Sequence, residues 1–231
     1  MSMDKKEMNE KPVKNRKRFS LILNISIIVF SVVLLAVEGV VYYQRSYLTP
    51  FWVNGQSMYP TLNGDATDAN GKELDETSGS AKVGYTVDYG VMDCHKNAIK
   101  KIKRFDIVVT KYTKEDTSNK IKRVIGLPGE IIEFKNDGDL YVDGRYYEQP
   151  IDENYIRGAY YPTKPTQLGD DEYFVCGDNR RNSLDSSDIG AIKREYITGK
   201  AIAICGTAEV CLDDKNFLDI KNIKYSWPRY L

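Results

Sequence analysis

Ser57 lies in the segment NGQSMYPTL, residues 54–62, where its hydroxyl could act as a nucleophile. A serine hydroxyl attacks poorly at its own pKa and requires a neighbouring base to take its proton. The chain has one histidine, His95, in the polar and cationic segment MDCHKNAIKK, where we expect a solvated surface side chain. The search for a base therefore turns to lysine, which accepts a proton only when its amine is neutral.

Lys122 has the sequence surroundings that best suit a neutral amine. Burial among apolar side chains disfavours the charged form and can lower a lysine pKa by several units from about 10.4. The segment IKRVIGLPG places Lys122 in a strand between Ile121 and Val124, and the strand ends at Gly126. On spacing alone the alternative stays open that Lys122 is an edge-strand lysine that discourages aggregation.

Four short stretches behind an apolar anchor occur in an order that resembles the bacterial type I signal peptidases. These are serine-lysine proteases that cut leader peptides from exported proteins. The stretches are GQSMYPTL, RFDIVV, KRVIGLPGE and GDNRRNSLDS, and the single anchor is similar to the Gram-positive form. The resemblance implies a mostly β, signal-peptidase-like catalytic domain behind one N-terminal transmembrane helix. It also implies that Ser57 is the nucleophile and Lys122 the general base.

Supporting roles follow from the same resemblance. It implies that Ser183 hydrogen-bonds the amine of Lys122 and orients it. It further implies that Asp185 supports the site by pairing with a nearby arginine, for which Arg123 is the candidate in this chain. We expect no cofactor, and one histidine without any C-x-x-C pair argues against a metal site.

Substrate selection is also implied by the resemblance, as cleavage after small residues in sites of the Ala-x-Ala kind. Shallow apolar pockets would exclude larger side chains, and our candidates for their lining are Met58, Val53 and Ile121. The substrate backbone would add as a strand beside Ile121. The backbone N–H of Ser57 is one implied oxyanion donor. Some members have a serine where this chain has Gly55, so the second donor is unassigned.

The element that must carry this site to its substrate is the apolar run 21–43, which has one acidic residue, Glu38, and no Lys or Arg. A helix of 23 residues spans the hydrocarbon core of about 30 Å, and a cleaved signal peptide would have a shorter apolar run. Basic residues dominate the segment before it, which favours a cytoplasmic N-terminus. We predict a cell-membrane protein with a cytoplasmic basic tail at 1–20, a transmembrane helix at 21–43 and an extracytoplasmic catalytic domain at 44–231.

Short strands dominate the predicted catalytic domain, among them 106–110, 121–126 and a hairpin around residues 136–138. A polar insertion extends from about 63 to 100, and its acidic first part, 63–82, is predicted to be a loop. Cys205 and Cys211 bracket GTAEV, so a hairpin disulfide and two free thiols are both open.

The balance of charged residues limits the kinds of partner that we expect. Lys and Arg number 33 and so do Asp and Glu, which argues against a nucleic acid held by bulk charge. The expected partners are the signal peptides of exported preproteins, the lipid bilayer and the secretion machinery. Self-cleaving repressor-type proteins also use a serine and a lysine, but they lack an anchor. A further alternative is a dedicated or inactive anchored relative that binds export substrates rather than cleaving them. Three departures from the family's usual residues favour it: Phe105 where a glycine is usual, Lys120 where an aromatic residue is common, and Ser187 where an arginine is common.

Overall fold

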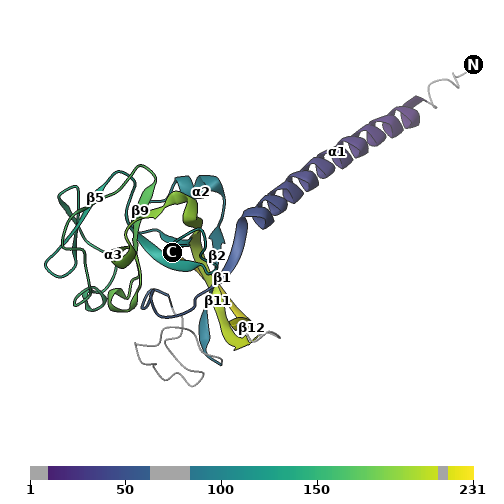
Figure 1. The fold of residues 1–231 in the computed structure, drawn as a ribbon. Coiled ribbons are helices and arrows are strands. Elements are labelled where there is room, and N and C mark those ends of the chain that lie inside the picture. The colour runs from purple at the N-terminus through teal and green to yellow at the C-terminus, as the bar shows by residue number, and fades with distance from the viewer. Residues whose placement is uncertain (1–9, 63–83, 213–217) are drawn as a thin grey trace, which may run out of the picture. The chain divides into compact units, whose positions relative to one another are not determined.

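The structure of the protein is a computed structural model that describes residues 10–62, 84–212 and 218–231 (Figure 1). It consists of two units, Met1–Tyr47 and Leu48–Leu231. The predicted loop at 63–82 lies outside the described residues.

The first unit contains one long helix, α1, Glu10–Tyr47. Its segment Arg18–Tyr43 is long and apolar enough to cross a membrane. The apolar side chains of this segment are exposed along its whole length; Phe30 and Leu35, for example, are 67% and 66% exposed. Since exposed apolar surface of this extent is unfavourable in water, the helix suits the apolar interior of a bilayer.

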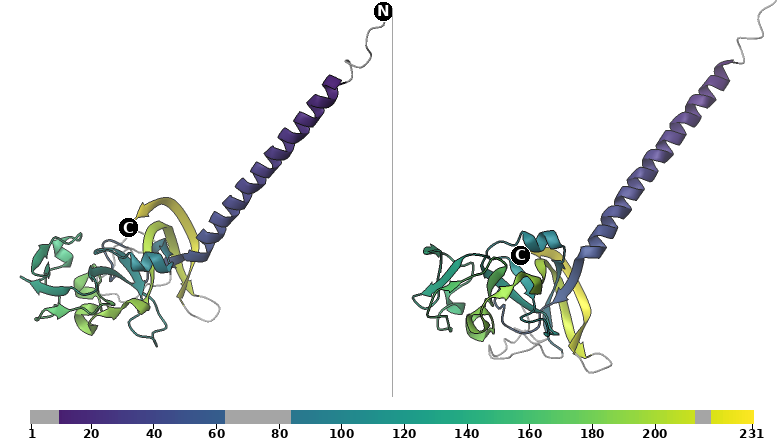
Figure 2. Two further views of the ribbon diagram at one scale, coloured as in Figure 1. Left: turned by 90° about the horizontal axis from the view of Figure 1, so that it is seen from above. Right: turned by 45° about the horizontal axis from the view of Figure 1, so that its top comes forward.

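The second unit is built on an eight-stranded antiparallel sheet. Its strands follow the order β1-β2-β11-β3-β4-β9-β10, and β12 pairs with β11. β11 and β12 form a long, curved ribbon (Figure 2). The strand bounds are β1 Leu48–Trp52, β2 Thr86–Asp93, β3 Ile107–Thr110, β4 Lys120–Gly126, β9 Glu172–Cys176, β10 Ile192–Lys193, β11 Ile197–Leu212 and β12 Leu218–Tyr230.

A smaller antiparallel sheet of four strands has the order β7-β6-β5-β8. It lies at the opposite end of the second unit from β1 and β12 (Figures 1 and 2). Its strands are β5 Ile131–Lys135, β6 Asp139–Val142, β7 Arg145–Tyr147 and β8 Thr166–Gln167. The predicted hairpin is confirmed as β5–β6, and its turn residues Asn136, Asp137 and Gly138 have positive φ angles of 45°, 62° and 114°.

Short helical segments connect the strands in the described part of the second unit. Two are α-helical, α2 Lys96–Lys100 and α3 Ser186–Ile189, and three are 3₁₀ turns, η1 Glu153–Tyr155, η2 Arg180–Asn182 and η3 Arg194–Tyr196. The mostly β fold class is therefore confirmed. The predicted strands at 106–110 and 121–126 correspond to β3 and β4, and the later part of the predicted insertion contains β2 and α2.

Two apolar clusters pack the two sheets together and hold the segment that carries Ser57 against the large sheet. Ile125 and Phe174 of the large sheet pack with Ile132 and Leu140 of the small one. A second cluster holds the segment that carries Ser57, and its buried members are Val53, Met58, Leu62, Ile107, Ala201 and Ile204.

The four cysteines are free thiols. Cys205 and Cys211 both lie on β11, six positions apart, which is about 20 Å along a strand. A disulfide requires Cα atoms within about 7 Å, so the alternative of a hairpin disulfide is wrong.

Candidate active site

Ser57 lies in the turn that follows β1. Gly55 has a φ angle of 87° and opens this turn, while Met58 and Leu62 are fully buried and fix it in the core. The Ser57 carbonyl accepts a hydrogen bond of 3.0 Å from the backbone N–H of Asn179. The segment is therefore held by apolar packing on one side and by the loop after β9 on the other.

Lys122 reaches Ser57 from β4. Its Nζ donates a hydrogen bond of 2.7 Å to Ser57 Oγ, although the two residues lie 65 positions apart. Lys122 is only 4% exposed. Burial lowers the pKa of the Lys122 amine to about 8, while the Asp185 carboxylate opposes this by raising it. An edge lysine that discourages aggregation would be solvated, so that alternative is wrong.

The strand pairing of β4 changes at Lys122. On one side, β3 pairs with Lys120 to Arg123. On the other side, β9 pairs only from Arg123 onward, where Arg123 faces Cys176. The first part of β4 thus has one strand neighbour where the rest has two.

Asp185 organises the loop beside the two side chains. Its Oδ2 accepts hydrogen bonds from the Ser183 hydroxyl at 2.7 Å and from the Gly177 N–H at 2.8 Å. Its Oδ1 accepts one from the Ser187 N–H at 3.0 Å, which caps α3. A side chain at Gly177 would clash with both Ser183 Oγ and the Ser57 carbonyl. Glycine at 177 therefore allows these two segments to approach.

The predicted pairing of Arg123 with Asp185 is wrong. Arg123 forms a two-pronged ion pair with Asp178, in which Nε–Oδ1 is 2.8 Å and Nη2–Oδ2 is 2.5 Å. Asp178 follows Cys176, the register partner of Arg123, by two residues, so it lies within reach of the guanidinium. The Asp185 carboxylate is instead occupied by its own loop. The hydrogen bond of Ser183 likewise goes to Asp185 rather than to Lys122.

Two grooves meet at Ser57 and Lys122. The first, of about 400 Å³, is lined by Thr49, Pro50, Phe51, Trp52, Asn54, Ser57, Met92, Val109, Asn119, Lys120, Ile121 and Lys122. The second, of about 460 Å³, is lined by Asn54, Gly55, Gln56, Ser57, Tyr112, Lys120, Lys122, Arg181, Asn182, Ser183, Leu184 and Asp188. A substrate chain crossing the reactive pair could occupy both.

Of the three predicted lining residues, one borders the first groove. Ile121 lines it. The prediction is wrong for Met58 and Val53, which are 0% and 1% exposed and pack into the core cluster with Leu62. They lie in the interior because the turn after β1 uses them as its apolar anchors.

The single histidine has a structural role. His95 Nδ1 accepts a hydrogen bond of 3.0 Å from the Asn97 N–H and caps α2. It lines neither groove. In the described ranges, no group of three or more His, Cys, Asp or Glu side chains could hold a metal ion.

Comparison with known proteins places this geometry in a family. Residues 22–205 match the family model described as signal peptidase, peptidase S26. The chain belongs to the signal peptidase family. It is 34% identical to signal peptidase I P of Bacillus subtilis subsp. natto over 80% of this chain and 89% of that one. It is also 34% identical to signal peptidase I S of Bacillus subtilis strain 168 over 65% of this chain and 72% of that one. A crystal structure of a signal peptidase I from Enterococcus faecalis V583 covers 43% of this chain and 96% of its own at 28% identity, with a TM-score of 0.36.

As a signal peptidase family member, the chain is a serine peptidase. Sequence reasoning missed part of what holds the site of this peptidase. Arg180 is buried, donates from Nε to the Gly177 carbonyl at 2.9 Å, and donates from Nη2 to Gln149 Oε1 at 2.6 Å. Gln149 Nε2 in turn donates to the Gly138 carbonyl at 2.8 Å. Arg180 falls within the matched stretch GDNRRNSLDS, but no sequence signal marks Gln149.

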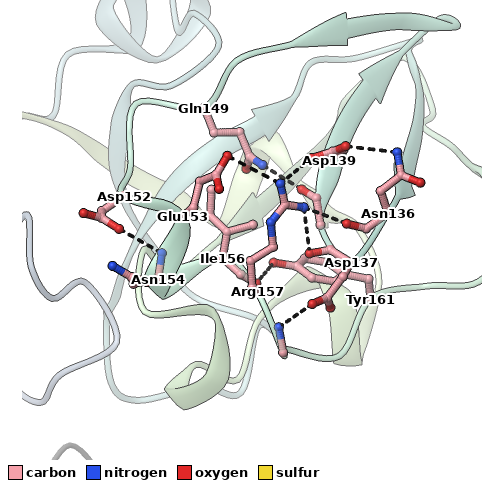
Figure 3. A network of polar contacts seen from close by, with 12 residues as sticks. Asn136, Asp137, Asp139, Gln149, Asp152, Glu153, Asn154, Ile156, Arg157 and Tyr161 are labelled. Carbon is pink, nitrogen blue, oxygen red and sulfur yellow. Dashed lines mark hydrogen bonds and ion pairs between the residues drawn. The ribbon is translucent and has the colours of Figure 1, made fainter.

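The turn to which Gln149 binds is held by Arg157 (Figure 3). Arg157 Nη1 donates to the Asn136 carbonyl at 2.6 Å, and its Nη2 forms an ion pair of 2.9 Å with Asp139. The Asp137 carboxylate accepts from the Gly158 N–H at 2.9 Å. A continuous series of hydrogen bonds therefore connects the β5–β6 turn with the peptide at Gly177.

Proposed function

We propose that this signal peptidase removes signal peptides from exported preproteins by means of a Ser57–Lys122 dyad. The observation that carries the proposal is the 2.7 Å separation between Ser57 Oγ and the Nζ of a buried lysine. A second support is the lowered pKa of Lys122, about 8, because about one tenth of the amine is then neutral at pH 7, far more than at its ordinary pKa.

The reaction begins when neutral Lys122 accepts the Ser57 hydroxyl proton. Ser57 Oγ attacks the scissile carbonyl carbon and forms a tetrahedral oxyanion, to which the Ser57 backbone N–H donates. As the carbon–nitrogen bond breaks, the Lys122 ammonium gives its proton to the departing amine. An acyl-enzyme remains on Ser57. Lys122 then takes a proton from water as the water oxygen attacks the acyl carbon. The bond between that carbon and Ser57 Oγ breaks, the signal peptide leaves with a free carboxyl group, and the Lys122 ammonium returns its proton to Ser57 Oγ.

Supporting groups keep the lysine in place. Asp185 accepts a hydrogen bond from the Ser183 hydroxyl, which holds the loop of Ser183 beside the groove that Lys122 lines. Arg123 acts at a distance from the reacting atoms, because its ion pair with Asp178 fixes the end of β9 against β4. Both roles are positioning roles.

Substrate binding uses the part of β4 that β9 leaves unpaired. A signal peptide adds as a strand beside Lys120–Lys122, and its main-chain groups bond to β4. Ile121 and Phe51 line the groove there and favour small side chains, as in Ala-x-Ala sites. Helix α1 anchors the peptidase in the cell membrane with its N-terminus cytoplasmic and residues 44–231 extracytoplasmic, a proposal supported by the apolar span and the basic residues before it.

Purified full-length protein tests this function on a preprotein with an Ala-x-Ala site. We expect cleavage after the second alanine, and loss of cleavage when leucine replaces that alanine. Ser57→Ala and Lys122→Ala should each lower the rate by at least about 10³-fold while the folded spectrum is retained. Wild-type activity in Lys122→Ala would reject the dyad. No cleavage by the wild-type chain would favour an anchored relative that only binds export substrates.

A further inference from the structure

A third cavity, of about 520 Å³, lies beside α2 and shares no lining residue with the two grooves at Ser57. We call it the α2 cavity. Its lining residues are Cys94, Lys96, Ile99, Lys100, Asp171, Arg194, Glu195 and Ile197. Because it is separate from the reacting atoms, the peptidase reaction does not account for it.

Positive charge in the α2 cavity is not neutralised by ion pairs. Among the described residues, no carboxylate lies within ion-pair distance of Lys96 or Lys100. Arg194 Nε is buried, and no described residue accepts a hydrogen bond from it. A buried N–H without an acceptor costs about 1–3 kcal/mol. Arg194 Nη2 donates to the Asp170 carbonyl at 3.4 Å, and Lys96 and Lys100 are exposed. The cavity therefore presents cations that an anionic ligand can reach.

Two carboxylates also line the cavity, Asp171 and Glu195. The backbone fixes one of them beside the arginine, because the Arg194 N–H donates to the Asp171 carbonyl at 2.7 Å. Three cations against two anions leave a net positive charge, and two carboxylates add acceptors for hydroxyl groups. Ile99 and Ile197 supply an apolar wall. The lining thus suits an amphipathic ligand that combines a phosphate, hydroxyl groups and a hydrocarbon part.

Few residues separate the end of the apolar span from the strand that pairs beside this cavity. Cys94 Sγ donates to Thr49 Oγ1 at 3.4 Å, and Asp93 pairs with Leu48, the first residue after α1. The apolar span ends at Tyr43, five residues earlier, and five residues extend at most about 18 Å. If α1 crosses the membrane, the headgroup layer is the nearest source of phosphate groups.

We propose that the α2 cavity binds the headgroup of an anionic, hydroxyl-bearing membrane lipid of the phosphatidylglycerol type. Lys96, Lys100 and Arg194 hold the phosphate through charge-assisted hydrogen bonds. Asp171 and Glu195 accept from the headgroup hydroxyls. This inference rests on the proposed membrane anchoring and is independent of the Ser57–Lys122 reaction.

Native mass spectrometry of the full-length protein in detergent tests the site, with phosphatidylglycerol titrated into the micelles. We expect one lipid to be retained per chain, and Lys96→Gln/Lys100→Gln to bind it at least about tenfold more weakly, since each cation near a lipid phosphate contributes substantially. The control Lys164→Gln/Lys224→Gln removes the same charge from two exposed lysines outside the cavity and should bind as the wild type does.

Three results would overturn the proposal. They are equal retention by both double variants, equal retention of phosphatidylethanolamine, and displacement of the lipid by millimolar inorganic phosphate, which would indicate a site for free phosphate. Cleavage of a soluble peptide, measured on the same samples, should be equal in all three proteins. Failure of the peptidase proposal is thereby distinguished from failure of the lipid site.

Discussion

A buried amine next to a hydroxyl governs the chemistry at the scale of single residues. Lys122 has a pKa of about 8 because burial disfavours its charged form, and Asp185 is the largest of the charges that raise it again. These two opposing effects set the fraction of active base. The acid limb of the rate profile should therefore report the environment of Lys122.

The first prediction concerns this acid limb. Only the neutral amine accepts the Ser57 proton, so kcat/KM should rise with pH up to about 8 and then level off, falling about tenfold per pH unit below that value. Asp185→Asn removes a charge that raises the Lys122 pKa, and the limb should move to lower pH. Asparagine can still cap α3. The acid limbs of the wild type and of Asp185→Asn are measured as kcat/KM on a soluble peptide over a pH series. An acid limb that does not move in the variant, or that moves to higher pH, would contradict this assignment.

The stability of the fold should also depend on pH through Lys122, and it should rise with pH as activity does. The pKa of Lys122 is lower in the folded chain, about 8, than its ordinary value of 10.5, so the unfolded state binds the proton more tightly. The folded state loses stability as pH falls from about 10.5 to about 8, and the loss is complete below 8.

Lys122→Met should accordingly be inactive and more stable at pH 7. Two and a half pKa units correspond to about 3 kcal/mol, which is the upper limit of the gain. Urea unfolding at pH 7 and pH 10 measures it, and the difference between variant and wild type should shrink at pH 10. Lys120→Met, on the same strand but part-exposed, is the control. Equal effects in both variants would show that burial of the amine is not the cause.

The spacing around Lys122 left an edge-strand lysine open, and it was the resemblance of four short stretches to a known family that singled out Ser57 and Lys122. The partner of Arg123 was not predictable in this way, since it depends on the register between β4 and β9. Phe105 illustrates the same limit. Its φ angle of 70° explains why glycine is usual there, but only coordinates reveal that this chain tolerates a large residue in the left-handed region.

At the scale of elements, the small sheet is connected to the active site by the side chain of Gln149. Gln149 links the Gly138 carbonyl of the β5–β6 turn to Arg180, and Arg180 holds the Gly177 carbonyl. Gly177 lies against both Ser57 and Ser183. The turn, with Arg157 across it (Figure 3), is thus an outer support for the catalytic loop.

Gln149→Leu tests this support. The change keeps the size of the side chain but removes both hydrogen bonds, so kcat should fall about tenfold while KM stays within twofold, because the groove residues are untouched. Gln149→Glu keeps an acceptor for Arg180 and should recover much of the rate. Asn154→Ala, in the neighbouring η1 turn, serves as the control. A fall in melting temperature with unchanged kcat would assign Gln149 a purely structural role.

Element prediction succeeded where the pattern was local. β3, β4 and the β5–β6 hairpin follow from β-branched runs and turn residues. The burial of Met58 and Val53 was mispredicted because proximity to a nucleophile in the sequence does not determine which side chains face the groove. Both side chains pack in one cluster with Ile107 of β3 and with Ala201 and Ile204 of β11.

In the whole molecule, the described core clusters all lie in Leu48–Leu231. No residue of α1 belongs to them, and the apolar side chains of its span are exposed. We therefore expect the second unit to fold without the helix. In the proposed function, the contribution of the helix is to hold the peptidase at the membrane.

A chain beginning at Leu48 should therefore keep its peptidase activity but lose its attachment to the membrane. Its kcat/KM on a soluble Ala-x-Ala peptide should stay within about threefold of the full-length value, because both grooves and the dyad are retained. On a preprotein held in lipid vesicles it should fall at least tenfold at equal total enzyme, since the anchor raises the effective concentration to about the millimolar range. Full-length Ser57→Ala gives the background rate in both assays. Loss of peptide cleavage with loss of the folded spectrum would mean that α1 is needed for folding, whereas equal rates on vesicles would remove its role in confining the enzyme.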